Sequence, residues 1–472
     1  MKDRLLPLYH RAPYPLKVLA ASAWGYYLRW WRYGPETERL VAEAREREYW
    51  SPEKWKVWQE NRLGYVLHRA ATQVPYYREQ WAQRRRRGDR ASWEYLENWP
   101  ILEKDPLRQH PKAFVADDCN IQNMFHEHTS GSTGKPLDLW WSKKTVQAWY
   151  ALFEARCRNW YGVSRRDRWG ILGGQLVAPA KNRTPPFWVW NAALNQLYLS
   201  SYHLAPDLMY YYLKAIQKYR IRYLWGYSSA LHALATWLIQ NRSFNLDLRV
   251  VITNAEPLYA YQLDAMKVAF RCPIRETYGM SEIVASASEC EAGNLHLWPE
   301  VGVTEIQTRD WGTDNGGSGE IICTGLLNQD MPLIRYQVGD QGSPSLSSHQ
   351  CPCGRSLPLL GKIDGRCDDI IYSKDGRMIG RLDPVFKTQL PILEAQIVQE
   401  SLDLIQVNFV PAPEFSVVDG KSLIQRLQDR LGPINVSLNP VHEIPRGPNA
   451  KFRAVICNLT QEKKANLVKQ KR

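Results

Sequence analysis

A short segment at residues 128–141, HTSGSTGKPLDLWW, gathers glycines and small hydroxyl-bearing residues around one lysine. Its backbone N–H groups, its hydroxyls and the Lys135 ammonium suit an anion, and phosphate is the usual ligand of such a loop. The segment does not fit a Walker P-loop, because Thr129 replaces the first glycine and Pro136 follows the lysine. An acylating serine of the S-x-x-K type, Ser132, would lack its companion S-D-N and K-T-G motifs. A polar, Gly-rich turn between two strands is the structural alternative.

Three later segments carry residue types that can serve one binding site. In RETYGMSE, Tyr278 offers a flat ring, Gly279 permits close approach of the backbone, and Glu282 offers a carboxylate. IRYQVGD ends an expected strand with Asp340, and PRGPNAKFRAV places Lys451 on a loop that leads into a strand. Each segment alone is more typical of a turn or a solvated charge. Their order and spacing along the chain therefore carry more weight than any one of them.

Two cysteine-containing segments, ECEAGNLHLW and CPCG, supply Cys290 with His296 and Cys351 with Cys353. Thiolates and an imidazole form a natural four-ligand, closed zinc site. The C-x-C-G spacing is a compact knuckle that can hold one ion through both sulfurs. The structural alternative is four reduced residues in loops that merely lie near each other. The nine cysteines of the chain are too sparse for a disulfide scaffold.

The motifs are spread over a region in which short apolar runs alternate with helical patterns. This alternation predicts α/β layers between about residues 125 and 345. The expected strands are 168–174, 222–227, 249–253 and 319–325, and the expected helices are 207–220, 228–240 and 260–270.

After Gly365 the pattern changes to that of a small α+β domain. The domain boundary is expected in the loop at 361–368. The expected elements are a hairpin with its turn at Asp375 and Gly376, a strand at 405–410, a helix with Leu423, Leu427 and Leu431 in register, and a strand at 452–457.

Length and charge limit the class of protein. A chain of 472 residues is too long for one ordinary core, so two or more domains are expected. The formal net charge of +13 fits an anionic ligand, an anionic membrane face or nucleic acid. The apolar stretch at 18–28 is shorter than the roughly 20 residues that cross a bilayer, and the N-terminus has no signal-peptide cleavage pattern. A soluble cytoplasmic protein is therefore expected.

The first hundred residues are aromatic and basic, with 19 Lys and Arg against 12 Asp and Glu. We expect residues 1–124 to form a helical extension packed on the main body. Peripheral contact with the inner face of a membrane is the alternative. That alternative rests on aromatic residues beside basic ones, as in an interfacial helix: Trp24, Tyr26, Tyr27, Trp30 and Trp31 with Lys17, Arg29 and Arg32.

In their order and spacing, the motifs resemble those of the adenylate-forming enzymes of the acyl-coenzyme A ligase superfamily. The sequence is most similar to the phenylacetate–coenzyme A ligase branch, which includes relatives linked to capsular polysaccharide biosynthesis and carries a similar cysteine and histidine set. The resemblance runs from about His128 to the C-terminus. It implies an α/β large N-terminal domain with mixed sheets flanked by helices, completed by residues 125–364. A hinge would join it to a small, mobile α+β domain with a basic tail at 365–472.

The same resemblance implies a site for ATP and Mg²⁺. Tyr278 would lie against the adenine ring, Asp340 would accept hydrogen bonds from both ribose hydroxyls, and Arg366 would reach the same sugar. Glu282 would hold Mg²⁺, with Thr133 as a second contact. The remaining nucleotide contacts would be the loop around the β- and γ-phosphates and the adenine-side segment: Ser130, Gly131, Ser132, Thr133, Gly134 and Lys135, then Asn254, Ala255 and Glu256.

Two residues of the small domain complete the implied machinery. Asp368 matches the hinge about which that domain pivots between half-reactions. Lys451 matches the lysine that bridges the attacking carboxylate and the α-phosphate, where a fixed cation offsets the repulsion between two anions. The family usually has glycine before this lysine, whereas this chain has Ala450. Alanine would be strained there if the position needs a positive φ.

The leading hypothesis is an AMP-forming ligase of the acid–thiol type. It would activate an aryl or arylacetic acid with ATP to an acyl-adenylate and pass the acyl group to coenzyme A. A second hypothesis passes the acyl group, or AMP itself, to an amine or alcohol in surface-polysaccharide or secondary-metabolite assembly. A third is a non-catalytic, membrane-associated binding protein, which the retention of Lys451, Asp340 and Glu282 speaks against. No nucleic-acid partner is expected, and homodimerisation stays open.

Overall fold

The structure is a computed structural model. It describes residues 9–128, 137–174, 177–178, 182–204, 206–241, 244–308, 318–344, 350–366, 371–372, 378–379, 390–431, 434–445, 453, 455–460 and 462–464.

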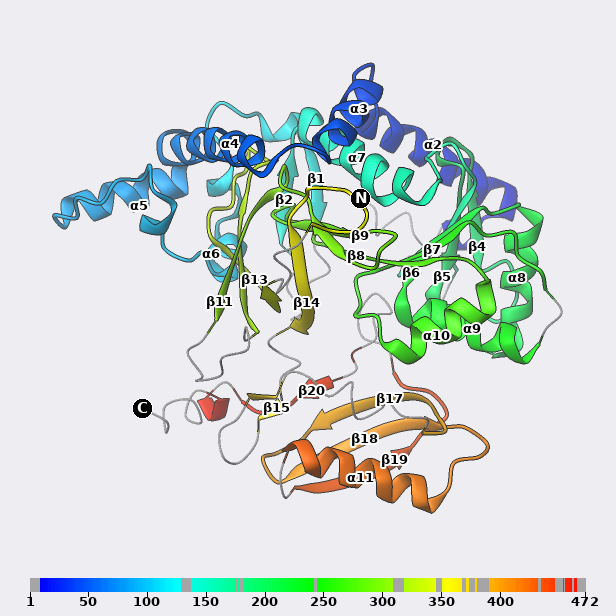
Figure 1. Ribbon diagram of the computed structural model, residues 1–472. Coiled ribbons are helices and arrows are strands. Elements are labelled where there is room, and N and C mark those ends of the chain that lie inside the picture. The colour runs from blue at the N-terminus through cyan, green and yellow to red at the C-terminus, as the bar shows by residue number, and fades with distance from the viewer. Residues whose placement is uncertain are drawn as a thin grey trace.

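Four helices at the N-terminal end lie along one side of the molecule (Figure 1). Ser51 caps the third of them by accepting a hydrogen bond from the Lys54 N–H, and a proline begins the third and the fourth. Val66, Leu67 and Ala70 of the third helix are buried in one core with strand residues of the main body. The helices are α2 (Tyr14–Arg32), α3 (Thr37–Arg47), α4 (Pro52–Gln73) and α5 (Pro75–Arg86).

A twelve-stranded mixed sheet forms the centre of the described chain, in the order β11-β12-β13-β14-β10-β9-β8-β7-β6-β3-β5-β4. Neighbours from β5 to β8 run parallel, and the other pairs are antiparallel. The strands of the parallel half and its edge are β3 (Trp169–Gly173), β4 (Trp188–Asn191), β5 (Gln196–Ser200), β6 (Tyr223–Tyr227), β7 (Val250–Asn254) and β8 (Ile274–Gly279). The antiparallel half consists of β9 (Ser286–Glu289), β10 (Leu295–Leu297), β11 (Gly302–Thr308), β12 (Gly319–Gly325), β13 (Tyr336–Pro344) and β14 (Leu359–Arg366).

Helices cover both faces of the parallel half, which explains its continuous apolar strands. Leu224 and Val251 face a core with α8 (Met209–Lys218), α9 (Ser228–Gln240) and α10 (Ala260–Phe270). Their neighbours Trp225 and Ile252 face a second core with α7 (Lys143–Cys157), Trp31 and Val41. The period-2 alternation of strand side chains thus divides the apolar residues between the two faces.

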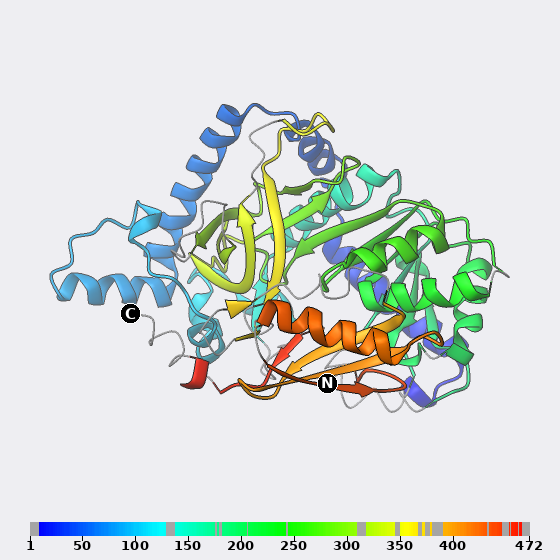
Figure 2. The same cartoon turned by 60° about the horizontal axis from the view of Figure 1, so that its bottom comes forward.

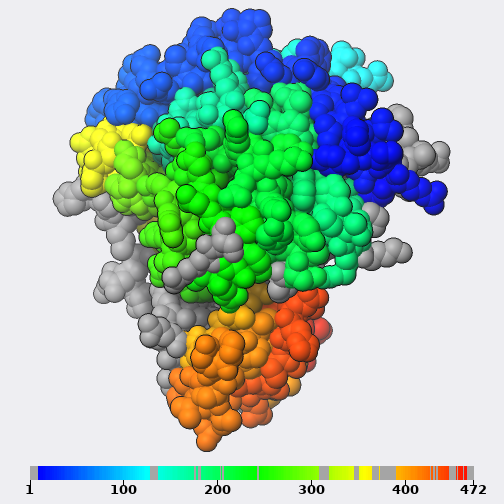
Figure 3. Space-filling view, turned by 90° about the vertical axis from the view of Figure 1, so that its right-hand side faces the viewer, coloured from blue at the N-terminus to red at the C-terminus, as the bar shows by residue number. Residues whose placement is uncertain are grey.

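The C-terminal part is a separate small lobe, which Figures 2 and 3 show projecting from the sheet domain. Its sheet has the order β19-β18-β17-β20 and is covered by one helix. Leu423, Leu427 and Leu431 of that helix are buried, as their spacing predicts. The elements are β17 (Ile392–Gln399), β18 (Leu404–Pro411), α11 (Val417–Leu431), β19 (Asn435–Pro440) and β20 (Val455–Cys457), beside a short β15 (Ile371–Tyr372) and β16 (Met378–Ile379) hairpin.

The predicted fold class, a large α/β domain with mixed sheets and helices plus a small α+β domain, is confirmed. The expected hairpin turn at Asp375 and Gly376 lies outside the described residues. Among the described helices, none combines the length and the apolar character that crossing a membrane requires.

Candidate nucleotide site and cysteine–histidine cluster

The adenine-side segment begins where β7 ends. Because β7 and β8 are parallel neighbours, their carboxyl ends lie at one edge of the sheet, the usual place for a ligand in an α/β fold. The Asn254 side chain is held against β6, where its amide donates to the Gly226 carbonyl and accepts from the Trp225 indole, both at 3.0 Å. Tyr278 lies one residue before the end of β8.

Tyr278 donates a hydrogen bond from its hydroxyl to Oδ2 of Asp340, at 2.9 Å. Burial, followed by the charge of Asp340, raises the pKa of the Tyr278 phenol, so it stays protonated. In the sheet, β14, β10 and β9 lie between the strands of these two residues. In a flat sheet that separation would be about 19 Å. The direct contact therefore requires the antiparallel half to curl until the two predicted nucleotide residues face each other.

Glu282, just beyond β8, is held by a residue that sequence reasoning missed. Tyr336, fully buried at the start of β13, donates its hydroxyl to Glu282 Oε1 at 2.9 Å. Tyr336 belongs to the same IRYQVGD segment as Asp340, but the motif drew attention only to the aspartate. Both carboxylates of the site thus accept a hydrogen bond from a tyrosine, which fixes their orientation.

Three non-glycine residues with positive φ adjoin these motifs. They are Ala255 at 62°, Ile283 at 50° and Arg335 at 47°. A β-branched residue such as Ile283 is especially unfavourable in this region of φ. Backbone strain of this kind persists only where surrounding packing enforces it, and it concentrates at functional sites. Here it marks the loop after β7, the loop after β8 and the loop before β13.

The Glu256 carboxylate accepts a hydrogen bond from the Ser229 N–H at 2.9 Å, at the start of α9. The N-cap residue is Tyr227, which makes no side-chain capping bond, and a negative charge from another loop binds the orphan N–H instead.

The predicted phosphate loop connects β1 (Phe125–His128) and β2 (Asp138–Trp141), which pair antiparallel with His128 opposite Asp138. Leu139 and Trp140 of β2 are buried in the same core as Tyr336, against which Tyr278 also packs. The base of the hairpin is therefore anchored beside the tyrosines of the candidate site. The base of the hairpin and Asp340 both belong to the large domain.

Several predicted site residues lie outside the described residues: Ser130, Gly131, Ser132, Thr133, Gly134, Lys135, Asp368 and Lys451. Arg366 is described only through its backbone, which pairs with Asp340 across β13 and β14. Their roles remain predictions.

The four predicted zinc ligands come together although 61 residues separate the first and third. Their ligand atoms all lie within 4.8 Å of one another. Cys290 and Cys351 are 3.6 Å apart through their sulfurs, and the Cys353 sulfur is 3.4 Å from Nε2 of His296. Such separations match a tetrahedral ion with Zn–S bonds of about 2.3 Å. The loop alternative, in which these residues are merely near each other, does not explain this convergence.

Neighbouring groups orient the ligands of the cluster and shift the pKa values of its thiols. His296 Nδ1 lies 3.0 Å from the Leu357 carbonyl, which leaves Nε2 directed at the thiols. The pKa of Cys351 is lowered despite its burial, because the Cys353 N–H and the Asn294 amide donate to its sulfur, the latter at 3.2 Å. Burial raises the pKa of Cys290 to about 12.

A buried ion-pair network ties the CPCG loop to the N-terminal helices. Arg355 donates to Glu48 Oε2 at 3.1 Å, and the Trp160 indole donates to the other oxygen at 2.8 Å. The Ser356 N–H also bonds to the Glu48 carbonyl at 2.8 Å. The cluster is thus braced by a residue more than two hundred positions away in sequence.

Similarity to known proteins agrees with this geometry. Residues 371–458 match the family described as the CapK C-terminal domain. Protein CapK of Staphylococcus aureus is 27% identical over 372 residues, covering 76% of this chain and 80% of CapK. The phenylacetate–coenzyme A ligase of Thermus thermophilus is 25% identical over 356 residues, covering 72% and 74%.

The chain thus resembles the adenylate-forming ligases of the CapK and phenylacetate–coenzyme A ligase branch. Its fold matches that of a 2-hydroxyisobutyryl-CoA ligase solved in the postadenylation state with an acyl-AMP, at a TM-score of 0.64 and 19% identity, covering 90% of this chain and 93% of that one.

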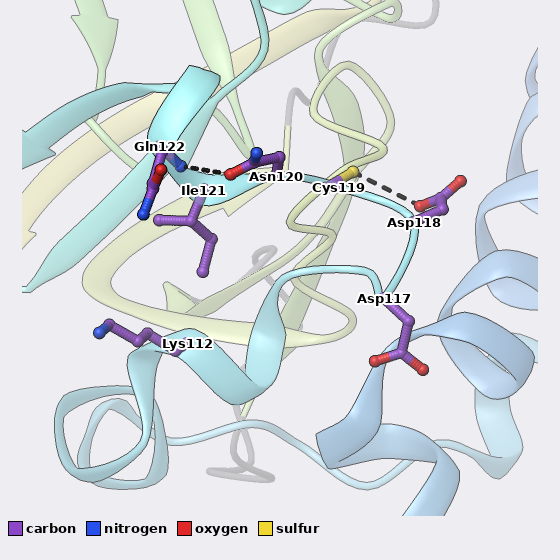
Figure 4. Close-up of a pocket in the computed structure, with 7 residues that line it drawn as sticks. All are labelled: Lys112, Asp117, Asp118, Cys119, Asn120, Ile121 and Gln122. Carbon is purple, nitrogen blue, oxygen red and sulfur yellow. Dashed lines mark hydrogen bonds between the residues drawn. The ribbon is translucent and has the colours of Figure 1, made fainter.

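Figure 4 shows a cavity of the described chain whose lining contains none of the predicted site residues. Asp118 in its wall pairs with Arg69 at 2.7 Å. Burial raises the pKa of the Cys119 thiol to about 12, so it is not a nucleophile at neutral pH. It has a volume of about 530 Å³ and is lined by Lys112, Asp117, Asp118, Cys119, Asn120, Ile121 and Gln122.

Glu276 on β8 makes the stability of the fold depend on pH. Burial, and next the charge of Glu289, raises its pKa to about 7. Because the folded state holds this proton more tightly than the unfolded chain, its contribution is complete below about pH 4.5 and is lost as the pH rises through 7. Glu276→Gln is expected to raise the melting temperature by about 5 °C at pH 8 and to change it little at pH 4.5.

Calorimetry of both proteins across this pH range is the measurement. Glu60→Gln, an exposed glutamate on α4, is the matched control and should leave the profile unchanged. Equal shifts for Glu276→Gln at both pH values would contradict the assignment.

Proposed function

We propose that this ligase activates a carboxylic acid with ATP, forming an acyl-adenylate and pyrophosphate, and then transfers the acyl group to the thiol of coenzyme A. The carboxylate oxygen attacks the α-phosphorus, and the bond from that phosphorus to the bridging oxygen of pyrophosphate breaks. The thiol then attacks the acyl carbon, loses its proton and releases AMP.

The observation that carries this proposal is the contact between Tyr278 and Asp340. Asp340 would bind the ribose hydroxyls, with its carboxylate oriented by the Tyr278 hydroxyl, while the tyrosine ring lies against adenine. Glu282, oriented by Tyr336, would hold Mg²⁺ together with Thr133. The ion would supply charge neutralisation at the phosphates. Lys135 and its neighbours in the hairpin loop would bind the β- and γ-phosphates.

The cysteine–histidine cluster is proposed to hold a structural zinc ion. Cys290, His296, Cys351 and Cys353 would be its ligands, and four protein ligands leave no open coordination position for chemistry. The ion would fasten the loop after β9 to the CPCG loop before β14.

The acid is proposed to be an aryl or arylacetic acid, on the similarity to phenylacetate–coenzyme A ligases. The aromatic residues between 188 and 227 do not strengthen this choice. Tyr212, Tyr223 and Trp225 are buried in the hydrophobic cores of the sheet domain. An amine or alcohol acceptor is the alternative hypothesis, which the assay below distinguishes from transfer to coenzyme A.

ATP–pyrophosphate exchange over a panel of aryl, fatty and amino acids tests activation separately from transfer. Exchange is expected with at least one acid, and Asp340→Ala is expected to abolish it, whereas Asp264→Ala on the exposed side of α10 is not. Adding coenzyme A, an amine or an alcohol then identifies the acceptor. ATP binding without exchange across the panel would instead support a non-catalytic binding protein.

Tyr336→Phe tests whether Glu282 holds the metal. Loss of the hydrogen bond is expected to raise the Mg²⁺ concentration for half-maximal exchange by about tenfold, because orienting partners of metal ligands typically have effects of this size. Tyr77→Phe is the matched control, since its buried hydroxyl bonds to the Pro332 carbonyl in the same core. An equal Mg²⁺ dependence in the two variants would remove Tyr336 from the proposed site.

A further inference from the structure

Helix α2 carries its large apolar residues on the outside. Leu16, Leu19, Ala23, Tyr26 and Trp30 follow one another at steps of three or four residues, and Tyr27 lies four residues after Ala23, so all six share one face. A surface helix normally turns such a stripe toward the core. Here the side chains of the stripe are exposed to solvent, on a helix that lies at the outer edge of the molecule (Figure 1). The exposed fractions are Leu16 55%, Leu19 65%, Trp24 44%, Tyr26 62%, Tyr27 43% and Trp30 57%.

The opposite face of α2 is built from small residues and is locked in place. Ser22 Oγ accepts a hydrogen bond from the Ala192 N–H at 3.1 Å. A Cβ atom added at Gly25 would lie 2.0 Å from Oδ1 of Asn191, so only glycine permits this approach. Tyr14 at the first turn bonds through its hydroxyl to that of Tyr219 at 2.9 Å. The helix therefore cannot rotate to bury its aromatic face without rebuilding its contact with β4 and the turn after it.

The charged residues of α2 and its flanking segment all have one sign. Residues 4–35 contain five Lys or Arg and no Asp or Glu. Lys17 and Arg29 flank the stripe, and the Lys143 ammonium lies 3.5 Å from the centroid of the Trp30 ring. A protein partner would need to match an aromatic ridge bordered by positive charge. An anionic lipid surface does so directly, because Trp and Tyr suit the headgroup region and each nearby Lys or Arg attracts the phosphates.

We propose that the outer face of α2 binds an anionic lipid bilayer as an in-plane interfacial helix. Trp24, Tyr27 and Trp30 would enter the boundary between headgroups and acyl chains, and Lys17, Arg29 and Lys143 would contact lipid phosphates. The helix does not span the bilayer, since α2 lacks the apolar length. This inference is independent of the proposed ligase activity, because none of its residues belongs to the nucleotide site.

Vesicle flotation with the full chain tests the proposal. The protein is expected to float with vesicles of equal parts phosphatidylglycerol and phosphatidylcholine, and at least about tenfold less with phosphatidylcholine alone. Trp24→Ala with Trp30→Ala is expected to lower partitioning into the anionic vesicles by about tenfold or more. Lys17→Glu with Arg29→Glu is expected to do the same at low salt, with a smaller difference at high salt.

Tyr49→Ala with Tyr95→Ala is the matched control, because both side chains are exposed outside α2. It should bind vesicles as the unaltered chain does. Thermal melting of all variants separates loss of binding from loss of folding. Failure of the unaltered chain to float with anionic vesicles would overturn the proposal. So would a concentration-dependent dimer that the Trp24→Ala, Trp30→Ala variant loses, since a second copy would then cover this face.

Discussion

Replacement of Lys451 by alanine is expected to slow ATP–pyrophosphate exchange by about 100- to 1,000-fold. In the proposed reaction a carboxylate approaches the α-phosphate, so two anions must come within bonding distance. An ammonium fixed between them offsets the repulsion while charge moves to the bridging oxygen. Because this interaction forms mainly in the transition state, kcat is expected to fall more than the apparent affinity for ATP.

Transfer from preformed acyl-adenylate to coenzyme A should be retained in Lys451→Ala, since the small domain would withdraw this lysine for the second half-reaction. The two half-reactions are measured separately by exchange and by thioester formation. Lys421→Ala, an exposed lysine on α11 of the same lobe, is the matched control. Exchange in Lys451→Ala comparable to that of the Lys421 variant would remove the lysine from the mechanism.

Removal of the proposed zinc ion is expected to produce the largest change in stability. A structural ion that is bound about 1,000-fold above its dissociation constant contributes about 4 kcal/mol to folding. In a domain of this size, its loss should lower the melting temperature by about 5 °C. Cys351→Ser, or treatment with a strong chelator, is expected to have this effect. Added Zn²⁺ should restore the melting temperature of the chelator-treated protein but not that of the Cys351→Ser variant.

Metal content and melting curves check this expectation together. The unaltered protein should contain one zinc per chain, and Cys351→Ser should contain none. Cys323→Ser is the matched control, because that thiol is also fully buried but lies outside the cluster. A metal-free preparation whose melting temperature is insensitive to both chelator and Zn²⁺ would contradict the zinc proposal.

Local patterns in the sequence predicted local structure closely. The helices expected at 228–240 and 260–270 and the strand at 319–325 have those bounds in the structure. These segments have a strong period and clear ends, so their form depends little on distant contacts. The helix expected at 207–220 instead begins at Met209, after a 3₁₀ turn at Pro206–Leu208. The ends of helices and strands depend on capping and packing, and the spacing of apolar residues does not predict either.

Contacts between distant segments could not be predicted from the sequence unless both partners were scarce residue types with the same chemical use. The thiols and imidazole of the cluster are scarce residue types with one shared use, so their convergence could be predicted. Nothing of this kind distinguishes the pair of Tyr336 and Glu282, which are 54 residues apart. The same holds for Arg355 and Glu48, which are 307 residues apart. Tyrosine and arginine can make many kinds of contact, and only the folded structure shows which contact each one makes.

The insertion of β14 beside β10 has a consequence for synthesis on the ribosome. β10 is complete when residue 297 is added, whereas its far edge receives its partner only with residues 359–366. At roughly 5–20 residues per second, that wait lasts about 3 to 12 seconds. An unpaired edge invites pairing with other nascent chains. Because β10 is only three residues long, it offers other nascent chains few backbone groups for strand pairing.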